Sequence, residues 1–399
     1  MKILHVEDVF YPNAGYQINI LPKYMSKVNN EIVIITSQTK KNKRPAATFF
    51  GKDDIEEKDK KYEDETGVKI VRLQIHGFLG SRVLFKKNVL FKKIKEHKPD
   101  ILYVHGNDTL TAMQILKARK KFGCPLVMDS HMLEMASKNK LNKLFRWYYK
   151  KFYTPIVKKE NIPVIRTQND NYVEKCLGIP LKQAPWVSYG SDTILFHPDQ
   201  QIRDKFRKEY NISENAFVVV YAGKLDDAKG GKFFAECIQK KIETDKELIF
   251  VIVGNTSGEY EKGVEDIFAG SENRIIRFPT QKYTDLAKFF QSADLAVFPK
   301  QCSLSFYDVQ ACGLPVLSED NNINVDRCSH KNGWNFKAGD IEDFRLKLQT
   351  IVDMPKLEYS KYSHNAYEFI RKNYNYEDKA REYEKIIEDT YKTWKELKN

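Results

Sequence analysis

Short apolar runs alternate with amphipathic stretches along both halves of the chain. Runs of strand length lie at residues 3–6, 31–36, 68–73, 101–105, 126–129 and 164–167, and again at 218–221, 248–253, 275–278, 295–298 and 316–317. Helical spacing of apolar residues fills many of the intervals. Such alternation predicts parallel sheets covered by helices on both faces. Because 399 residues can bury two cores, we expect an α/β protein with two doubly wound domains.

Three segments interrupt this alternation and suggest how the chain is divided. Residues 37–66 are polar and highly charged, so we expect a long surface loop there. Residues 187–198 read VSYGSDTILFHP, in which Gly190 permits a tight bend and Pro198 breaks the segment. We therefore expect domains at 1–194 and 199–375. Residues 376–399 predict a charged helix whose apolar positions recur at helical spacing.

Composition narrows the class of protein. Hydrophobic residues make up 42% of the chain and charged residues 30%, which is ordinary for a soluble globular protein. No apolar run approaches membrane-spanning length, and the N-terminal MKILHV reads as a first strand and not as a signal peptide. The six cysteines are scattered without a C-x-x-C pair, which favours reduced thiols in a cytosol. We expect a cytoplasmic protein that needs no cofactor.

The most informative segment runs from residue 293 to 316 and reads ADLAVFPKQCSLSFYDVQACGLPV. A strand ends at Pro299, a polar loop follows, and a helix over 306–312 has Ser303, Leu304, Ser305 and Asp308 at or near its first turn. A helix N-terminus suits a phosphate, and a carboxylate beside it can accept hydrogen bonds from sugar hydroxyls. Together these features indicate a nucleotide sugar. An ordinary strand, loop and helix with a surface aspartate is the alternative.

This segment resembles the nucleotide-sugar loop of the retaining GT-B glycosyltransferases of family 4, E-x7-E-x-x-A-C-G-x-P. Asp308 stands at the second acidic position and residues 311–315 match the tail, whereas Lys300 replaces the first acid, which usually helps to hold the donor sugar. The 187–198 segment resembles the family's G-V-D-x-x-x-F-x-P linker, with Ser191 in place of valine. The resemblance implies two Rossmann-like doubly wound parallel-sheet domains facing across a cleft. It assigns the acceptor to the first domain and the donor to the second, with helix 376–399 crossing back to the first.

A second match lies in YAGKLDDAKGGKFF at 221–234, which resembles the family's G-R-L-x-x-x-K-G. Lys224 replaces the arginine, which keeps the charge but loses the bidentate fork, and Lys229 is retained. Two ammonium groups can stabilise the charge that grows on a departing diphosphate. A P-loop is excluded because no Lys-Ser/Thr pair closes the motif. The chain also lacks an Asp-x-Asp pair, so we predict a reaction without metal. The alternative is two solvated lysines after a strand.

In the first domain, Gly15 lies where the family brings backbone close to the donor phosphate, although Ala14 replaces the first of the usual two glycines. Tyr16 and Gln17 follow as candidates for the acceptor side. His105 and His131 end strands. His131 resembles the family histidine that reaches the donor sugar, and His105 is a further acceptor-side candidate. Either histidine could instead be satisfied by the backbone. Asp129 and Glu134 could act as general bases, but the family's retaining outcome requires none.

The formal charge of +12 is concentrated partly in two basic and aromatic segments of the first domain. Residues 138–159 interleave eight lysines and arginines with leucines and aromatic residues, and residues 85–98 carry six lysines around Phe85, Leu90 and Phe91. Such helices suit an anionic membrane surface, on the inner face of a cell membrane, which would give access to a lipid-linked acceptor. The alternative is a core helix with a solvated lysine face.

These observations predict a hexosyltransferase-like enzyme that moves a sugar from a nucleotide diphosphate sugar, by default a UDP-sugar. The acceptor would be a glycan or a lipid-linked molecule in surface polysaccharide or glycoconjugate assembly. One alternative is a nucleotide-sugar-binding partner without turnover, because Lys300 replaces the first acid. Another is a GT-B nucleotide-sugar epimerase, for which no acid/base carboxylate pair stands out. A nucleic-acid binder is not favoured, because the sequence contains no recognised binding module.

Overall fold

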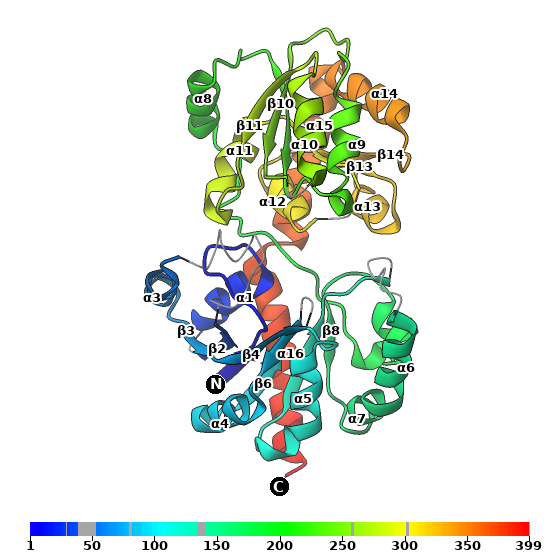
Figure 1. The fold of residues 1–399 in the computed structure, drawn as a ribbon. Coiled ribbons are helices and arrows are strands. Elements are labelled where there is room, and N and C mark those ends of the chain that lie inside the picture. Colours follow the sequence, from blue (N-terminus) through cyan, green and yellow to red (C-terminus); the bar gives the residue numbers. More distant parts are fainter. Residues whose placement is uncertain are drawn as a thin grey trace. The chain divides into compact units, whose positions relative to one another are not determined.

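The computed structural model describes residues 1–28, 30–38, 53–79, 82–134, 141–256, 259–300 and 303–398, without the side chains of residues 259–262. The chain forms two compact units (Figure 1): unit 1 comprises Met1–Tyr189 and Tyr376–Asn399, and unit 2 comprises Gly190–Asn375. Each unit contains one six-stranded sheet with parallel pairing throughout. The predicted pair of parallel-sheet domains is confirmed.

Unit 1 is doubly wound, with helices on both sides of its sheet (Figure 1). Across the sheet the strands are β3 (Lys69–Leu73), β2 (Glu31–Ser37), β1 (Lys2–Val6), β6 (Ile101–Val104), β7 (Leu126–Ser130) and β8 (Val164–Arg166). The helices are α1 (Gln17–Ser26), α3 (Ile55–Thr66), α4 (Lys87–His97), α5 (Leu110–Ala118), α6 (Asn142–Phe152), α7 (Thr154–Lys159) and α16 (Tyr376–Glu396), with short helical segments η2 (Arg119–Lys121), η4 (Tyr172–Cys176) and η5 (Leu181–Gln183). Strands β6 and β7 are buried along their whole length, as expected of central parallel strands.

Two features of unit 1 differ from the sequence-based expectation. The expected loop at 37–66 ends in helix α3, whose Ile55 and Tyr62 are buried while its charged residues cover the outside. This prediction was wrong because nine Asp, Glu and Lys residues conceal two anchoring positions at helical spacing. An antiparallel hairpin of β4 (Ile75–Leu79) and β5 (Arg82–Phe85) was not predicted either. It lies outside the six-stranded sheet.

Helix α16 belongs to unit 1, although it follows unit 2 in the sequence. Its buried residues are Tyr376, Ala380, Tyr383 and Ile387. The Tyr383 hydroxyl donates a hydrogen bond to the Val187 carbonyl at 2.7 Å, and the Tyr376 ring stacks on that of Tyr24. An apolar stripe and specific polar contacts thus hold this charged helix in place.

Unit 2 repeats the architecture. Its strand order is β11 (Arg274–Phe278), β10 (Leu248–Val253), β9 (Phe217–Ala222), β12 (Leu295–Phe298), β13 (Val316–Glu319) and β14 (Gly333–Phe336). Its helices are α8 (Gln200–Glu209), α9 (Gly231–Cys237), α10 (Glu259–Ala269), α11 (Ala287–Ser292), α12 (Ser305–Ala311), α13 (Asn322–Arg327), α14 (Ile341–Val352) and α15 (Lys356–Asn373), with short segments η6 (Asp227–Lys229) and η7 (Tyr283–Leu286). Strand β14 was not predicted, because GWNF lacks an apolar run.

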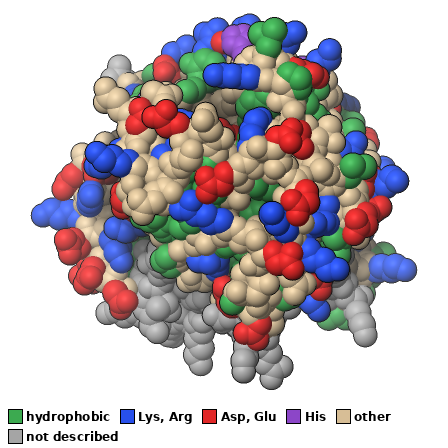
Figure 2. Space-filling model, turned by 90° about the horizontal axis from the view of Figure 1, so that it is seen from above, with side chains coloured by type: hydrophobic (Ala, Val, Ile, Leu, Met, Phe, Trp, Pro, Cys, Tyr) green, Lys and Arg blue, Asp and Glu red, His purple; other side chains and the backbone are tan. Residues whose placement is uncertain are grey.

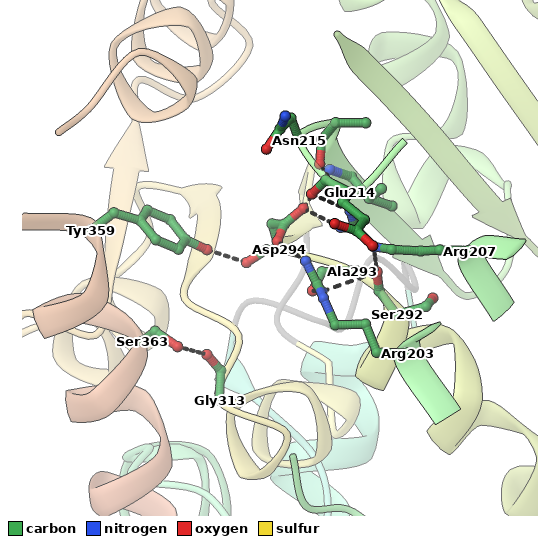
Figure 3. Close-up of polar contacts among 12 residues, drawn as sticks. Arg203, Arg207, Glu214, Asn215, Ser292, Ala293, Asp294, Gly313, Tyr359 and Ser363 are labelled. Carbon is green, nitrogen blue, oxygen red and sulfur yellow. Dashed lines mark hydrogen bonds and ion pairs between the residues drawn. The ribbon is translucent and has the colours of Figure 1, made fainter. Parts of the chain in front are cut away.

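A buried ionic cluster fixes the amino end of β12 (Figure 3). Asp294 accepts hydrogen bonds from Arg203 at 2.6 Å, from Arg207 at 2.7 Å and from the Val218 amide at 2.7 Å. The Tyr359 hydroxyl of α15 donates to the Asp294 carbonyl. Each charged group of this cluster is therefore paired with an opposite charge. The contacts also join α8 and α15 to the sheet. This cluster lies at the opposite end of the strands from the loops considered below.

The surface and the cysteines agree with an ordinary globular chain. On the face drawn in Figure 2, Lys and Arg side chains are intermixed with Asp and Glu side chains. Among the described helices, none is both long enough and apolar enough to cross a membrane. Cys124, Cys176, Cys237, Cys312 and Cys328 are buried free thiols, whereas Cys302 lies outside the described residues.

Candidate functional site

The strand order of unit 2 brings two of the predicted donor loops together. Strand β9 lies between β10 and β12, so the direction of winding reverses between β9 and β12. Ligands of open parallel sheets bind beside the carboxyl ends of the strands at such a reversal point. The loop after β9 carries Lys224 and Lys229, and the loop after β12 carries Lys300 and Ser303. The two sequence motifs therefore occupy one edge of one sheet.

Direct contacts join these two loops. The Lys300 ammonium donates to the Asp227 carbonyl at 3.0 Å and lies 3.5 Å from the Asp227 carboxylate. Gly230 has a φ of +74°, and a Cβ atom there would lie 3.1 Å from the Lys300 Cβ and 3.3 Å from the Pro299 Cβ. A Cβ on Gly231 would lie 2.6 Å from the Leu225 backbone. The glycine pair is therefore needed for the turn and for the close approach of the loops.

The backbone around the two motif lysines is fixed by side chains. The Asp226 carboxylate accepts a hydrogen bond from the Lys229 amide at 2.9 Å, which caps η6. The Tyr221 hydroxyl donates to the Lys224 carbonyl at 2.5 Å. The Lys224 side chain is exposed and that of Lys229 is half-buried. With Lys300, the two loops carry three lysines at the reversal point, and their predicted contact with a diphosphate stays a prediction.

The loop that leads into α12 is fixed by a hydrogen bond from α13. The Ser303 and Ser305 hydroxyls lie 2.9 Å apart, and Arg327 of α13 donates to the Ser303 carbonyl at 3.0 Å. Leu304 is the N-cap of α12 and makes no side-chain cap. Arg327 is 5% exposed and follows the loop by more than twenty residues, so its contact with Ser303 could not be predicted from sequence.

Asp308 has protein partners in this structure. It is 5% exposed, and its Oδ1 accepts hydrogen bonds from the Ser191 hydroxyl at 2.8 Å and the Tyr283 hydroxyl at 3.2 Å. Burial raises the pKa of Asp308 to about 7, although these two hydrogen bonds act in the opposite direction. Asp308 thus joins α12 to the start of unit 2 and to η7. The predicted contact between Asp308 and a ligand hydroxyl stays a prediction.

The reversal point of unit 1 lies between β1 and β6. Gly15 is half-buried in the loop after β1, and Tyr16 is 43% exposed at the start of α1. Gln17 is 4% exposed, yet its amide nitrogen and oxygen have no hydrogen-bond partner among the described residues. A buried polar group of this kind needs an explanation, and an absent ligand is one.

His131 and His105 belong to a chain of polar side chains at the same edge. His5 Nδ1 lies 2.9 Å from His105 Nε2, and His105 Nδ1 lies 2.8 Å from Asp129 Oδ2. Asp129 Oδ1 lies 2.8 Å from His131 Nε2, and His131 Nδ1 lies 2.5 Å from the Tyr189 hydroxyl. We call these five residues the histidine chain. Tyr189 and His5 could not be identified from sequence, because they are distant in the chain from Asp129.

Charges within the histidine chain set its protonation. Burial alone would raise the pKa of Asp129, but the charges of His131 and His105 hold it well below its usual range. Burial alone would lower the pKa of His131, but Asp129 and Tyr189 raise it well above the usual value. The pKa of His5 is lowered by burial and by His105. The favoured state is therefore an ionised Asp129 beside a protonated His131 and a neutral His5.

Both ring nitrogens of His131 face protein atoms, and His105 is 2% exposed. The ring nitrogens of His105 lie beside His5 and Asp129, and the assignment of His105 to the acceptor side stays a prediction. Tyr189 is the end of the histidine chain, and its oxygen can accept from His131 while its own proton is donated elsewhere. Glu7, just after β1, was not among the candidate residues identified from sequence. Burial raises the pKa of Glu7 to about 7, against the opposing charge of His105.

Among the described residues, one group of side chains has potential metal-ligand atoms close enough together to bind an ion. Ligand atoms of His105, Asp129 and His131 all lie within 4.8 Å of one another. Each of these side chains already pairs with a neighbour at 2.8 Å. In this structure the three side chains pair with one another as part of the histidine chain.

The comparisons with known proteins agree with this geometry. Residues 202–392 match the family described as "Glycosyl transferases group 1". A probable sucrose-phosphate synthase of Thermosipho melanesiensis is 24% identical over 415 residues, covering 95% of this chain and 92% of that protein. Among solved structures, a glycosyltransferase of Rickettsia africae has a TM-score of 0.75 at 14% identity, covering 98% of both chains. HepE of Anabaena in complex with UDP-glucose has a TM-score of 0.73 at 15% identity, covering 98% of this chain and all of the other.

Proposed function

We propose that this chain, a glycosyltransferase of group 1 (the retaining glycosyltransferase family 4), transfers a hexose from a UDP-sugar to a glycan or lipid-linked acceptor. The transfer proceeds with retention and without a metal ion. We assign the nucleotide diphosphate to unit 2 and the acceptor to unit 1. Surface polysaccharide or glycoconjugate assembly, in the cytoplasm or at the inner face of the cell membrane, is the proposed setting.

The observation that carries this proposal is the junction of the two loops at the β9–β12 reversal point. Lys300 binds the backbone of the loop that carries Lys224 and Lys229, so three lysines lie on adjoining loops at the edge where ligands bind in such sheets. Charge grows on the diphosphate as the glycosidic bond breaks. Fixed cations at that position lower the barrier because they stabilise the transition state more than the ground state.

The residues of unit 1 are assigned to the sugar and the acceptor. A protonated His131 that donates to Tyr189 leaves the tyrosine O–H free to orient a sugar hydroxyl. Gln17 offers an amide oxygen and an amide nitrogen to the acceptor, since both lack partners among the described residues. In a retaining transfer, the departing phosphate oxygen can take the acceptor proton, so none of these groups has to act as a base.

Uridine is the proposed base because HepE, which shares the fold, binds UDP-glucose. Thermal-shift measurements with UDP, GDP, ADP and CDP test this choice, since a bound product raises Tm in proportion to its affinity. Release of UDP from UDP-glucose without an acceptor then tests turnover. Equal activity with and without EDTA is expected. Loss of activity in EDTA that Mn²⁺ restores would contradict the metal-free mechanism.

Two alternatives have a specific observation in their favour. Binding without turnover is favoured by Lys300, which stands at the position of the family's first acid. Its amine donates a hydrogen bond to the Asp227 carbonyl. Nucleotide-sugar epimerisation is favoured by Glu7, whose pKa of about 7 suits proton transfer at neutral pH. UDP binding without any UDP release would support the first alternative. Conversion of the donor sugar without an acceptor would support the second.

A further inference from the structure

Helix α6 has two apolar faces, and unit 1 buries one of them. Phe145, Tyr149 and the following Tyr153 pack against the core of unit 1. Tyr149 is fully buried, and its hydroxyl lies 3.2 Å from Asn107 Nδ2 and 3.3 Å from the Asn107 carbonyl. Asn107 lies just after β6, beside His105. The buried face therefore joins α6 to the carboxyl edge of the sheet.

The other apolar face of α6 is exposed. Leu144 is 61% exposed, Trp147 54%, Phe152 43% and Tyr148 36%. Lys151 lies among them, with its ammonium 5.0 Å from the Trp147 ring centre and 5.6 Å from that of Phe152. We call these five residues the α6 face. Monomeric proteins seldom leave so many large apolar side chains together in water without a partner.

Further lysines lie on α6 itself and on the next helix, α7. Lys143 and Lys150 are exposed on α6, and Lys158 and Lys159 are exposed on α7. The only acidic residue of the described segment 141–160 is Glu160, which pairs with Arg119. Helices α6 and α7 therefore carry a net positive charge, which complements a negatively charged surface.

Helix α4 has a similar composition but a different arrangement. Its Leu90, Phe91 and Ile94 are buried, and its Lys87, Lys92 and Lys95 are exposed. It is a core helix with a solvated lysine face, which is the ordinary arrangement. The two basic segments of the sequence are thus different in kind, and exposure of the apolar residues distinguishes them.

We infer that the α6 face docks on an anionic lipid bilayer. Tryptophan and tyrosine favour the level of the lipid headgroups, leucine and phenylalanine reach the acyl boundary, and lysine extends its ammonium toward phosphates. A protein partner would have to bury Lys151 at the centre of the contact, whereas a bilayer leaves it at the interface. Docking on a bilayer would give the proposed enzyme access to a lipid-linked acceptor, and that consequence rests on the proposed function. The docking itself does not depend on the proposed function.

Co-sedimentation of the full chain with vesicles tests this inference. We expect binding to vesicles that mix phosphatidylcholine with phosphatidylglycerol, and little binding to phosphatidylcholine alone. Each lysine near an anionic surface strengthens binding roughly fivefold, so K143E/K151E should weaken it by at least about 25-fold. The control K92E/K95E changes the net charge equally on α4 and should leave binding nearly unchanged. Equal losses in the two variants would overturn the inference, because net charge alone would then explain the binding.

The apolar part of the α6 face needs a separate test. W147S should lower binding to the anionic vesicles at high salt, where charge is screened. The control W186S removes another half-exposed tryptophan of unit 1, at 42% exposure, and should have little effect. Equal binding to neutral vesicles, or self-association that W147S abolishes without any vesicle binding, would refute the bilayer as the partner. UDP binding in solution should be unchanged in every variant, so a failure of docking is distinguishable from a failure of the proposed enzyme.

Discussion

Replacement of Asp129 by asparagine tests the electrostatic argument for the histidine chain. The carboxylate lies 2.8 Å from His131 Nε2 and is fully buried, whereas 36% of the His131 side chain is exposed. At an effective dielectric constant of about 20, two unit charges about 4 Å apart interact by about 4 kcal/mol. Solvent at the exposed imidazole reduces this to about 2 kcal/mol, which is typical of a hydrogen bond between charged groups. D129N should therefore weaken proton binding at His131 about 30-fold, and the pKa of His131 should fall.

Two measurements report this change. The NMR titration of the His131 ring, assigned by comparison with H131Q, gives proton binding directly. In steady-state kinetics, D129N should lower kcat at neutral pH by about tenfold, because a neutral His131 no longer holds Tyr189 through a charged donor. Binding of UDP should be unchanged, because the cations assigned to the diphosphate lie in unit 2. This division between kcat and donor binding would not arise from a general loss of folded protein.

The matched control is D108N. Asp108 is also a buried aspartate after β6, and it accepts a hydrogen bond from the Tyr172 hydroxyl at 3.1 Å. No contact links its side chain to His131 among those described, so the His131 titration should be unaffected. An unchanged His131 titration in D129N would refute the reasoning. An equal shift in D108N would attribute the effect to general disturbance of the sheet edge.

Three other predictions address the remaining assigned residues. K229A should lower kcat/KM at least tenfold, through a lost charged contact of about 1.5–3 kcal/mol, while K232A on α9 should not; a near-normal rate would exclude Lys229 from the site. Asp308 keeps its proton in the folded state up to a pKa of about 7, but loses it near 3.8 when unfolded, so the unfolding free energy should fall between those pH values. D308N should remove this decline, by up to about 4 kcal/mol, in denaturant titrations at several pH values, and parallel curves would contradict the assignment. Q17M should raise Tm, because a buried group without partners costs about 1–3 kcal/mol, and it should raise KM for the acceptor in initial-rate assays. A lower Tm would show that the Gln17 amide is satisfied within the protein.

The architecture could be predicted from sequence because parallel strands are buried on both faces. Strand β10, LIFVIV, is entirely buried, and such runs stand out in any window. The loop motifs were placed correctly at strand ends for the same reason. Strand β14 and helix α3 were missed because their few buried positions lie among polar residues. Tertiary packing, and not local apolar content, determines those two elements.

The side-chain partners in the candidate site could not be predicted, because partners come from distant segments. His131 and Tyr189 are 58 positions apart, and Ser191 and Asp308 are 117 apart. The family resemblance assigned His131 to the donor sugar, and it gave no sign that Asp129 and Tyr189 would lie beside the two ring nitrogens of His131. The sequence can indicate which residues gather at a sheet edge. Which of them face one another depends on rotamers and packing.

The distribution of unpaired buried polar atoms argues for a division of labour between the units. In unit 1, Gln17, Ser130 and Ser188 each have a buried polar atom without a partner among the described residues. In unit 2, Gln291 is the one such residue in the described part. Each unpaired buried atom lowers the unfolding free energy by about 1–3 kcal/mol. Several of them in one unit are a large part of a typical unfolding free energy of about 5–15 kcal/mol. Such a loss of stability is expected at a site where the hydroxyl groups of a bound ligand supply the missing hydrogen-bond partners. The proposed ligand of unit 2, a diphosphate, would be bound chiefly by charge, and charged lysines at a loop surface carry no such cost.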